Sequence, residues 1–211
     1  MGGPADICSR NVADAGAGIG APGLAMIAPL STRAYPPPPV PARFTMTVTR
    51  CDALPAAALE TLLAPFGLDL VWLGENAAIP GSYWGEPEAG LIGNRLLVRP
   101  DTPVHSALHE ACHWLCMDEA RRARLHTDAG GTDTEENAVC YLQCLLADEL
   151  AGYSRAQVFA DMDAWGYHFI LGSAAAWFAG DSDDATRWLV QRGLAVAIDG
   201  VVRLPPARAA R

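Results

Sequence analysis

The spacing of hydrophobic positions changes along the chain, from short alternating segments to longer helical repeats. Alternation with a period of two predicts strands with one buried face, whereas apolar residues three or four positions apart predict amphipathic helices. Strands are expected at residues 44–49, 68–73, 91–92, 95–99, 194–198 and 201–204, with turn pairs at 93–94 and 199–200 that predict two hairpins. Helices are expected at residues 55–66, 102–117, 134–150, 154–165, 167–178 and 181–193.

These elements predict one domain of the α+β class over residues 43–204. Its small mixed or antiparallel sheet would pack on helix 102–117 and on the following helix, and its C-terminal half would be mostly helical. Residues 1–42 are rich in Gly, Ala and Pro, so they bury little and are expected to form a disordered tail. Residues 205–211 are expected to be a frayed tail.

Composition narrows the class of protein. The chain has 211 residues, of which 51% are hydrophobic, enough for a core of ordinary size. Its net charge of −9 argues against binding nucleic acid, which generally requires a basic surface. No apolar run reaches the roughly 18 residues of a membrane span, and the first residues lack the compact apolar segment of a signal peptide. A cytoplasmic location is therefore expected, with secretion as the alternative.

The sequence H-E-A-C-H at residues 109–113 lies inside the predicted helix 102–117. Residues i and i+4 of a helix share one face, so His109 and His113 would direct two imidazoles toward one point. Neutral imidazole is a good ligand for Zn²⁺, and Glu110 could act as general base on a water activated by the metal. The structural alternative is a buried amphipathic helix whose histidines only form hydrogen bonds.

A third protein ligand is expected from the acidic start of helix 134–150. A glutamate there, on a helix packed against the first, would complete a His₂Glu site with one coordination position open. H-E-x-x-H at 109–113 followed by E-x-x-A at 135–138 resembles the gluzincin metallopeptidases and, more loosely, the ImmA/IrrE family. The resemblance covers roughly residues 91–147.

The resemblance to gluzincins implies a zincin-like fold, with the sheet against the metal-bearing helix. It also implies one Zn²⁺ per chain, bound by His109, His113 and Glu135, with Glu110 as the catalytic base. Those families usually carry Asn or Asp where this chain has Val139, which leaves Glu136 as an alternative ligand.

Four cysteines form two i, i+4 pairs, one on each of these helices: Cys112 with Cys116, and Cys140 with Cys144. Two interhelical disulfides, a four-thiolate metal site, or free thiols filling the helix interface are the alternatives. If the two pairs face each other, the 100° turn per residue makes Glu136 the better ligand, because it lies on the same side of its helix as Cys140.

The expected function is that of a zinc metallopeptidase, a hydrolase that cleaves a peptide or protein substrate and that could be a regulatory processing protease. An edge strand beside the site would pair with an extended peptide. Candidates for stabilising the oxyanion are His168, Tyr141 and Tyr153, and His105 would lie behind or beside the ligands. The alternative is a non-catalytic domain of similar fold that binds a partner or senses metal or redox state through its cysteine-rich helix pair.

Overall fold

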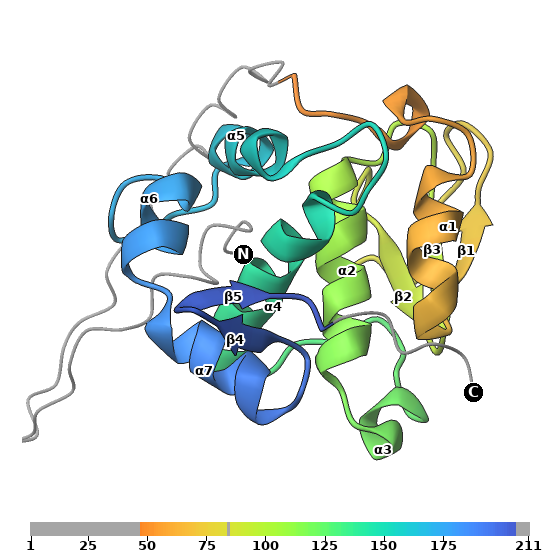
Figure 1. Ribbon diagram of the computed structural model, residues 1–211. Coiled ribbons are helices and arrows are strands. Elements are labelled where there is room, and N and C mark those ends of the chain that lie inside the picture. Colours follow the sequence, from red (N-terminus) through yellow and green to blue (C-terminus); the bar gives the residue numbers. More distant parts are fainter. Residues whose placement is uncertain (1–46, 84, 206–211) are drawn as a thin grey trace, which may run out of the picture.

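The computed structural model describes residues 47–83 and 85–205, which form a mixed α and β fold (Figure 1). This confirms the α+β class. The predicted tail at residues 1–42 and most of the tail at 205–211 lie outside the described residues. In Figure 1 helix α2 (Val104–Cys116) runs through the centre, with a small sheet on one side and the remaining long helices on the other.

The sheet has three strands in the order β1-β3-β2: β1 (Asp69–Trp72), β2 (Gly90–Ile92) and β3 (Arg95–Val98). Strand β3 pairs in parallel with β1 and antiparallel with β2. The β2–β3 hairpin turns at Gly93, whose φ of 57° suits a glycine, so this hairpin prediction is confirmed. The sheet is therefore small and mixed.

One face of the sheet supports helix α2, which carries the H-E-A-C-H motif and packs against β2 and β3. Helix α1 (Ala58–Leu63), followed by a 3-10 turn (Ala64–Phe66) that ends at Gly67, packs against β1. Of the 13 residues of α2, 11 are buried, so this helix is covered on nearly every side. Its polar residues thus belong to the interior, where each needs a partner or a ligand.

The face of α2 away from the sheet packs against α4 (Asp133–Ala147). The side chain of Thr132 caps α4 by accepting a hydrogen bond from the amide of Glu135. Helix α4 in turn packs against α5 (Arg155–Trp165) and α7 (Asp183–Gln191). The α2–α4 pair is therefore the core of the described fold.

The C-terminal half is mostly helical, as expected. Ser154 caps the start of α5, and Gly166 ends the helix in the left-handed conformation. An antiparallel hairpin of β4 (Val196–Ile198) and β5 (Val201–Arg203) follows near the C-terminal end of the described residues. The prediction of a helix over residues 167–178 is wrong in its first half, because α6 (Ala174–Gly180) begins only after Ser173. The Ser173 hydroxyl accepts from the amide of Ala176, which fixes the start of the helix there.

The strand expected at residues 44–49 is also not formed over its described part. Residues 47–49 are irregular, and Arg50 makes only an isolated bridge to Pro103. The amide of Thr49 is instead bound by the carboxylate of Asp161 on α5, at 3.1 Å. Residues 44–46 lie outside the described range.

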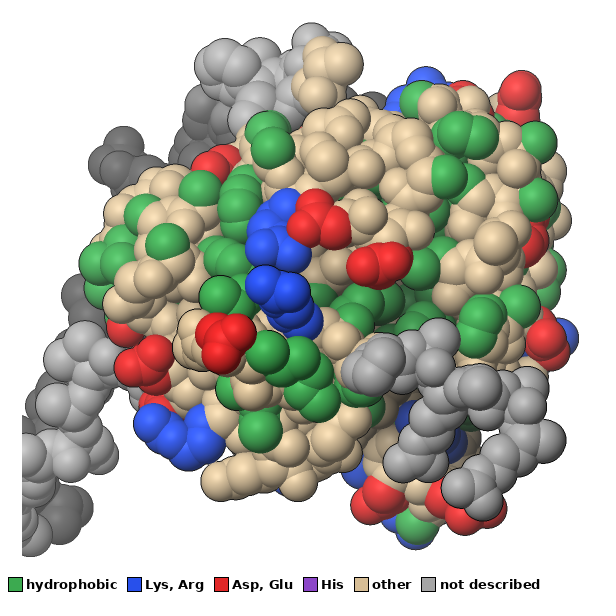
Figure 2. All heavy atoms as spheres, in the orientation of Figure 1, with side chains coloured by type: hydrophobic (Ala, Val, Ile, Leu, Met, Phe, Trp, Pro, Cys, Tyr) green, Lys and Arg blue, Asp and Glu red, His purple; other side chains and the backbone are tan. Residues whose placement is uncertain are grey.

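Surface charge is mixed on the face shown in Figure 2, where acidic and basic side chains lie beside one another among hydrophobic ones. Helices in the described part of the chain all fall short of the length and apolar character that crossing a bilayer requires.

Candidate metal centre

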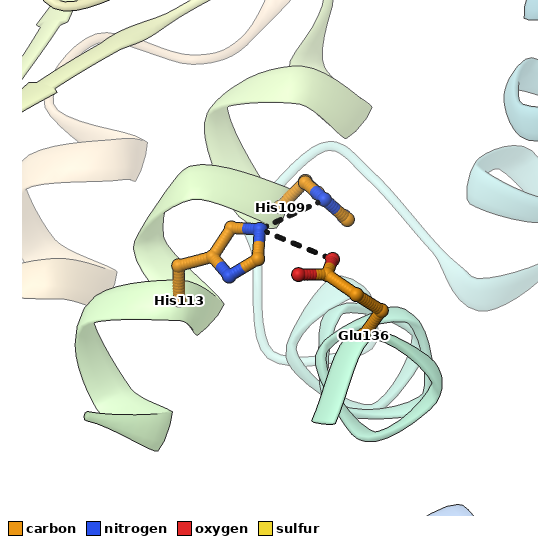
Figure 3. Close-up of side chains that lie close together, drawn as sticks. All are labelled: His109, His113 and Glu136. Carbon is orange, nitrogen blue, oxygen red and sulfur yellow. Dashed lines mark hydrogen bonds and ion pairs between the residues drawn. The ribbon is translucent and has the colours of Figure 1, made fainter. Parts of the chain in front are cut away.

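The two histidines of the H-E-A-C-H motif meet on one face of α2, as the i, i+4 spacing predicts. Nε2 of His109 and Nε2 of His113 are 3.1 Å apart, and the rings lie nearly perpendicular (Figure 3). The two residues are only 5% and 4% exposed. Two buried imidazole nitrogens thus point at the same small volume.

Glu136, at the start of α4, supplies the third group. Figure 3 shows its carboxylate extending from α4 toward the two histidines, with Oε2 at 3.5 Å from Nε2 of His113. One ligand atom from each of His109, His113 and Glu136 lies within 4.8 Å of the others. Within the described residues this is the group of His, Cys, Asp and Glu side chains whose atoms come close enough to share a cation.

Glu135, the third ligand that the family resemblance implied, is directed elsewhere. Its Oε1 accepts a 2.6 Å hydrogen bond from Arg121, in an ion pair. The structure therefore brings Glu136, and not Glu135, to the histidines. The reason is helix phase: Glu136, Cys140 and Gln143 follow one stripe of α4 that faces α2, and Glu135 lies about 100° away from it.

Gln143 is a residue of the site that the sequence did not suggest. Its side chain is fully buried, and its oxygen lies 2.8 Å from Nδ1 of His109. A carboxamide oxygen only accepts hydrogen bonds, so Nδ1 carries the hydrogen and Nε2 keeps its lone pair. The i+7 spacing from Glu136 is the signal that could have found it, since both residues lie on the stripe facing α2.

Burial keeps the two histidines in the protonation state that a metal ligand requires. The pKa of His109 falls to about 4, because desolvation outweighs the hydrogen bond to Gln143. Desolvation, with smaller contributions from His109 and Arg121, also holds the pKa of His113 well below its ordinary value. Both rings are therefore neutral at pH 7, which is the form that coordinates a cation.

An unpaired carboxylate oxygen in the donor set fits a divalent cation. Glu136 Oε2 is buried with no hydrogen-bond partner, and its 3.5 Å contact with Nε2 of a neutral His113 is not an ion pair. Burial is the main cause that raises the pKa of Glu136, so its charge is poorly compensated by the protein alone. A cation between these atoms would satisfy the carboxylate and both imidazoles together.

Glu110 lies beside this group; the residue is 6% exposed, and its Oε2 atom has no hydrogen-bond partner. Burial, followed by the negative charges of Glu88 and Glu136, raises the pKa of Glu110 to about 8. The carboxyl group is therefore tuned to exchange a proton near neutral pH. Such a group is suited to act as a general base.

Glu88 forms a second unusual carboxyl group near the motif. It precedes β2, and its Oε1 accepts a 3.1 Å hydrogen bond from the indole of Trp165. Burial raises the pKa of Glu88 to about 7 despite that bond. The amide of Ala89 next to it donates to the hydroxyl of Ser106, which lies one turn before Glu110 on α2. The segment before β2 is thus fixed onto the same face of α2 as Glu110.

His105 continues the histidine stripe one turn before His109 but does not join the ligand group. It is 1% exposed, and its ring packs against Trp165 and Tyr167 with both ring nitrogens unpaired. Burial lowers the pKa of His105 to about 3. It therefore forms part of the wall behind the site rather than its rim.

The three residues expected to stabilise an oxyanion do not lie against the histidines. Tyr141 stacks on Phe178, the hydroxyl of Tyr153 donates to Asp161 at 2.7 Å, and His168 is exposed. Tyr167 lies closer to the site, with its ring centroid 6.2 Å from that of His109. Its position depends on the loop after α5, so no local sequence pattern could distinguish it from the other aromatic residues.

The cysteines of the described chain are buried and form no disulfide, among them both pairs on α2 and α4. Their sulfur atoms also make no group close enough to share a metal ion, so within the described residues neither the disulfide nor the thiolate-cluster alternative is formed. Desolvation raises the pKa of Cys116 to about 12 and holds that of Cys112 well above its ordinary value. Buried neutral thiols of this kind act as small apolar residues that fill the helix interface.

The strand beside α2 is already paired on its outer edge. The amide of Leu91 in β2 donates to the carbonyl of Gly81, and its carbonyl accepts from Thr127 at 3.1 Å. The amide of Gly93 donates to Leu125. The expectation that an extended peptide adds to an open edge strand next to the site is therefore wrong for β2.

Comparisons with family models, with curated proteins and with solved structures return no match to this chain.

Proposed function

We propose that the protein is a zinc-dependent hydrolase that cleaves peptide bonds. The observation that carries the proposal is the convergence of His109, His113 and Glu136, with ligand atoms within 4.8 Å of one another, beside Glu110, whose Oε2 has no hydrogen-bond partner. Two imidazoles and one carboxylate are a usual donor set of catalytic zinc, and they leave one coordination position for water or substrate. The resemblance to gluzincins, with Glu136 in place of Glu135, supports the same function.

A bound zinc ion would supply the Lewis acidity that polarises a substrate carbonyl and lowers the pKa of a water molecule. Glu110 would accept the proton of that water as its oxygen attacks the carbonyl carbon. Its buried carboxyl group favours the neutral form, so it would hold the proton until the carbon–nitrogen bond breaks and the leaving amine takes it. The products are a carboxylic acid and an amine.

The residues around the reacting groups would orient the histidine ligand and exclude water from the rear of the site. The hydrogen bond from His109 to Gln143 fixes the ring that presents Nε2. Trp165, Tyr167 and His105 form an aromatic wall that keeps water from the rear of the site. Because the β2 edge is occupied, the substrate would be bound through its side chains or termini rather than by adding a strand.

The test combines metal content with activity in wild type and Glu110→Gln. We expect one zinc per chain in both proteins after reconstitution, and hydrolysis of a mixed peptide library by wild type alone. Loss of a general base should lower the rate by roughly 10²- to 10⁴-fold. Because Gln relieves the burial of a carboxyl group, the metal-free variant should be at least as stable as wild type, which excludes misfolding as the cause.

A matched control is Glu149→Gln, which removes an exposed glutamate on the segment after α4 and should leave zinc content and activity unchanged. Full activity of Glu110→Gln would refute the mechanism. Stoichiometric zinc in a wild-type protein that hydrolyses none of the peptides would support the non-catalytic metal-binding alternative instead.

A further inference from the structure

Arg121 lies in α3 (Glu119–Arg122), the short helix between α2 and α4, and its guanidinium group is bound on three sides. Nη1 donates to Glu135 Oε1 at 2.6 Å. Nη2 donates to the backbone carbonyls of Ala129 and Gly130 at 3.3 and 3.2 Å. One side chain thus joins the start of α4 to the loop that leads into it.

The same loop holds the candidate ligand. The amide of Gly131 donates a 2.8 Å hydrogen bond to Oε1 of Glu136, which leaves Oε2 directed toward His113. A Cβ atom at Gly131 would lie 2.5 Å from the carboxyl carbon of Glu135, so this backbone passes as close to the ion pair as a glycine allows. The position of the loop and the orientation of Glu136 are therefore set together.

We propose that Arg121 is a positioning residue that fixes the carboxylate of Glu136 in the orientation in which it faces the histidines. It binds Glu135 away from the site and holds the loop carbonyls so that the Gly131 amide orients Glu136. This inference rests on the metal site of the proposed function but concerns metal affinity and geometry rather than hydrolysis. A planar guanidinium group is needed, because only its fork of donors reaches a carboxylate and two carbonyls at once.

The test measures zinc dissociation constants by competition with a chelator in wild type, Arg121→Gln and Arg121→Lys. We expect Arg121→Gln to weaken zinc binding about 10- to 100-fold, the range found when a group that orients a metal ligand is lost. Lysine keeps the charge but lacks the fork, so its affinity should fall between the two. The control is Arg124→Gln, which removes an exposed arginine three residues along the same segment and should bind zinc as wild type does.

A spectroscopic readout separates positioning from a general loss of stability. The visible absorption bands of the cobalt-substituted protein report the ligand geometry, so they should shift in Arg121→Gln and not in Arg124→Gln. Gly131→Ala provides a second variant that leaves Arg121 in place and pushes Glu135 from the loop side. It should also weaken zinc binding and shift the cobalt bands.

Unchanged zinc affinity in Arg121→Gln, or in Gly131→Ala where Arg121→Gln does not fold, would overturn the proposal. So would an equal loss in Arg124→Gln. A wild-type protein that binds zinc without hydrolysing peptides would refute the hydrolase alone, and the affinities would still decide the role of Arg121. A wild-type protein that does not bind zinc would refute both.

Discussion

The carboxamide oxygen of Gln143 and Nδ1 of His109 lie 2.8 Å apart across the interface of α4 and α2, with both side chains buried. This single bond joins the helix that carries the candidate acidic ligand to the helix that carries the histidines. It fixes the hydrogen on Nδ1, and thereby leaves Nε2 of His109 for a metal.

Replacing Gln143 with Leu should therefore weaken zinc binding without removing a ligand. Leucine has a similar volume, but the Nδ1–H group of His109 would be buried without a partner and the ring orientation would no longer be fixed. We expect the zinc dissociation constant to rise about 10- to 100-fold. The unpaired donor should cost the metal-free protein about 1–3 kcal/mol of stability, offset in part because leucine also removes the buried, unpaired Nε2 of Gln143.

Chelator competition and urea denaturation measure these two effects. Gln191→Leu serves as the control, because it makes the same change at an exposed position of α7. Zinc affinity equal to wild type in Gln143→Leu would show that the hydrogen bond does not orient the ligand.

Glu136 and Glu135 allow a matched pair of substitutions at neighbouring positions. Glu136→Gln should prevent stoichiometric zinc binding, because an amide is a poor replacement for a carboxylate ligand. Glu135→Gln should keep one zinc per chain with reduced affinity, because it only weakens the contact with Arg121. Elemental analysis of both proteins after dialysis against the same zinc buffer measures the zinc content per chain of each variant.

Stability of the metal-free proteins gives an independent check on the same pair. Burial raises the pKa of Glu136, so its ionised form is disfavoured in the fold and Gln at this position should stabilise the metal-free protein near neutral pH. Glu135→Gln removes a partner of Arg121 and should not stabilise it. Zinc lost from Glu135→Gln and kept by Glu136→Gln would restore Glu135 as the ligand.

Local patterns in the sequence predicted the parts of the site that depend on one helix. The i, i+4 pair of His109 and His113 is a property of helix geometry alone, and the structure brings these two rings together. The choice between Glu135 and Glu136 depends instead on the rotation of α4 against α2, which is a property of packing. Gln143 carried no metal-ligand signature, so only the fold could place it against His109.

Contacts between residues far apart in the chain account for the other differences between the predicted and the observed structure. The closed edge of β2 results from Thr127 and Leu125, which come after α2 in the chain and return to pair with the strand. Thr49 alternates with bulky neighbours as a strand residue would, but Asp161 binds its amide, and among residues 47–83 and 85–205 no strand pairs with it. The local pattern of hydrophobic and polar residues predicts neither contact.

Glu88 should make the stability of the metal-free protein depend on pH. Burial raises its pKa from 4.5 to about 7, so the folded protein holds a proton that the unfolded chain releases. The stability contributed by the protonated group is complete below about pH 4.5 and is lost as the pH rises to about 7. Glu88→Gln removes this loss and keeps an oxygen that can accept from Trp165.

The free energy of unfolding of Glu88→Gln should therefore increase relative to that of wild type by about 1–3 kcal/mol as the pH rises from 4.5 to 7.5. One pKa unit corresponds to about 1.4 kcal/mol. Glu110 contributes a loss of stability in the same direction, so the variant keeps part of the pH dependence. Urea denaturation of metal-free wild type, Glu88→Gln and the exposed control Glu149→Gln at several pH values measures the difference. A gap between Glu88→Gln and wild type that stays constant over this range would mean that Glu88 is ionised in the fold, because only a proton released on unfolding can produce the slope.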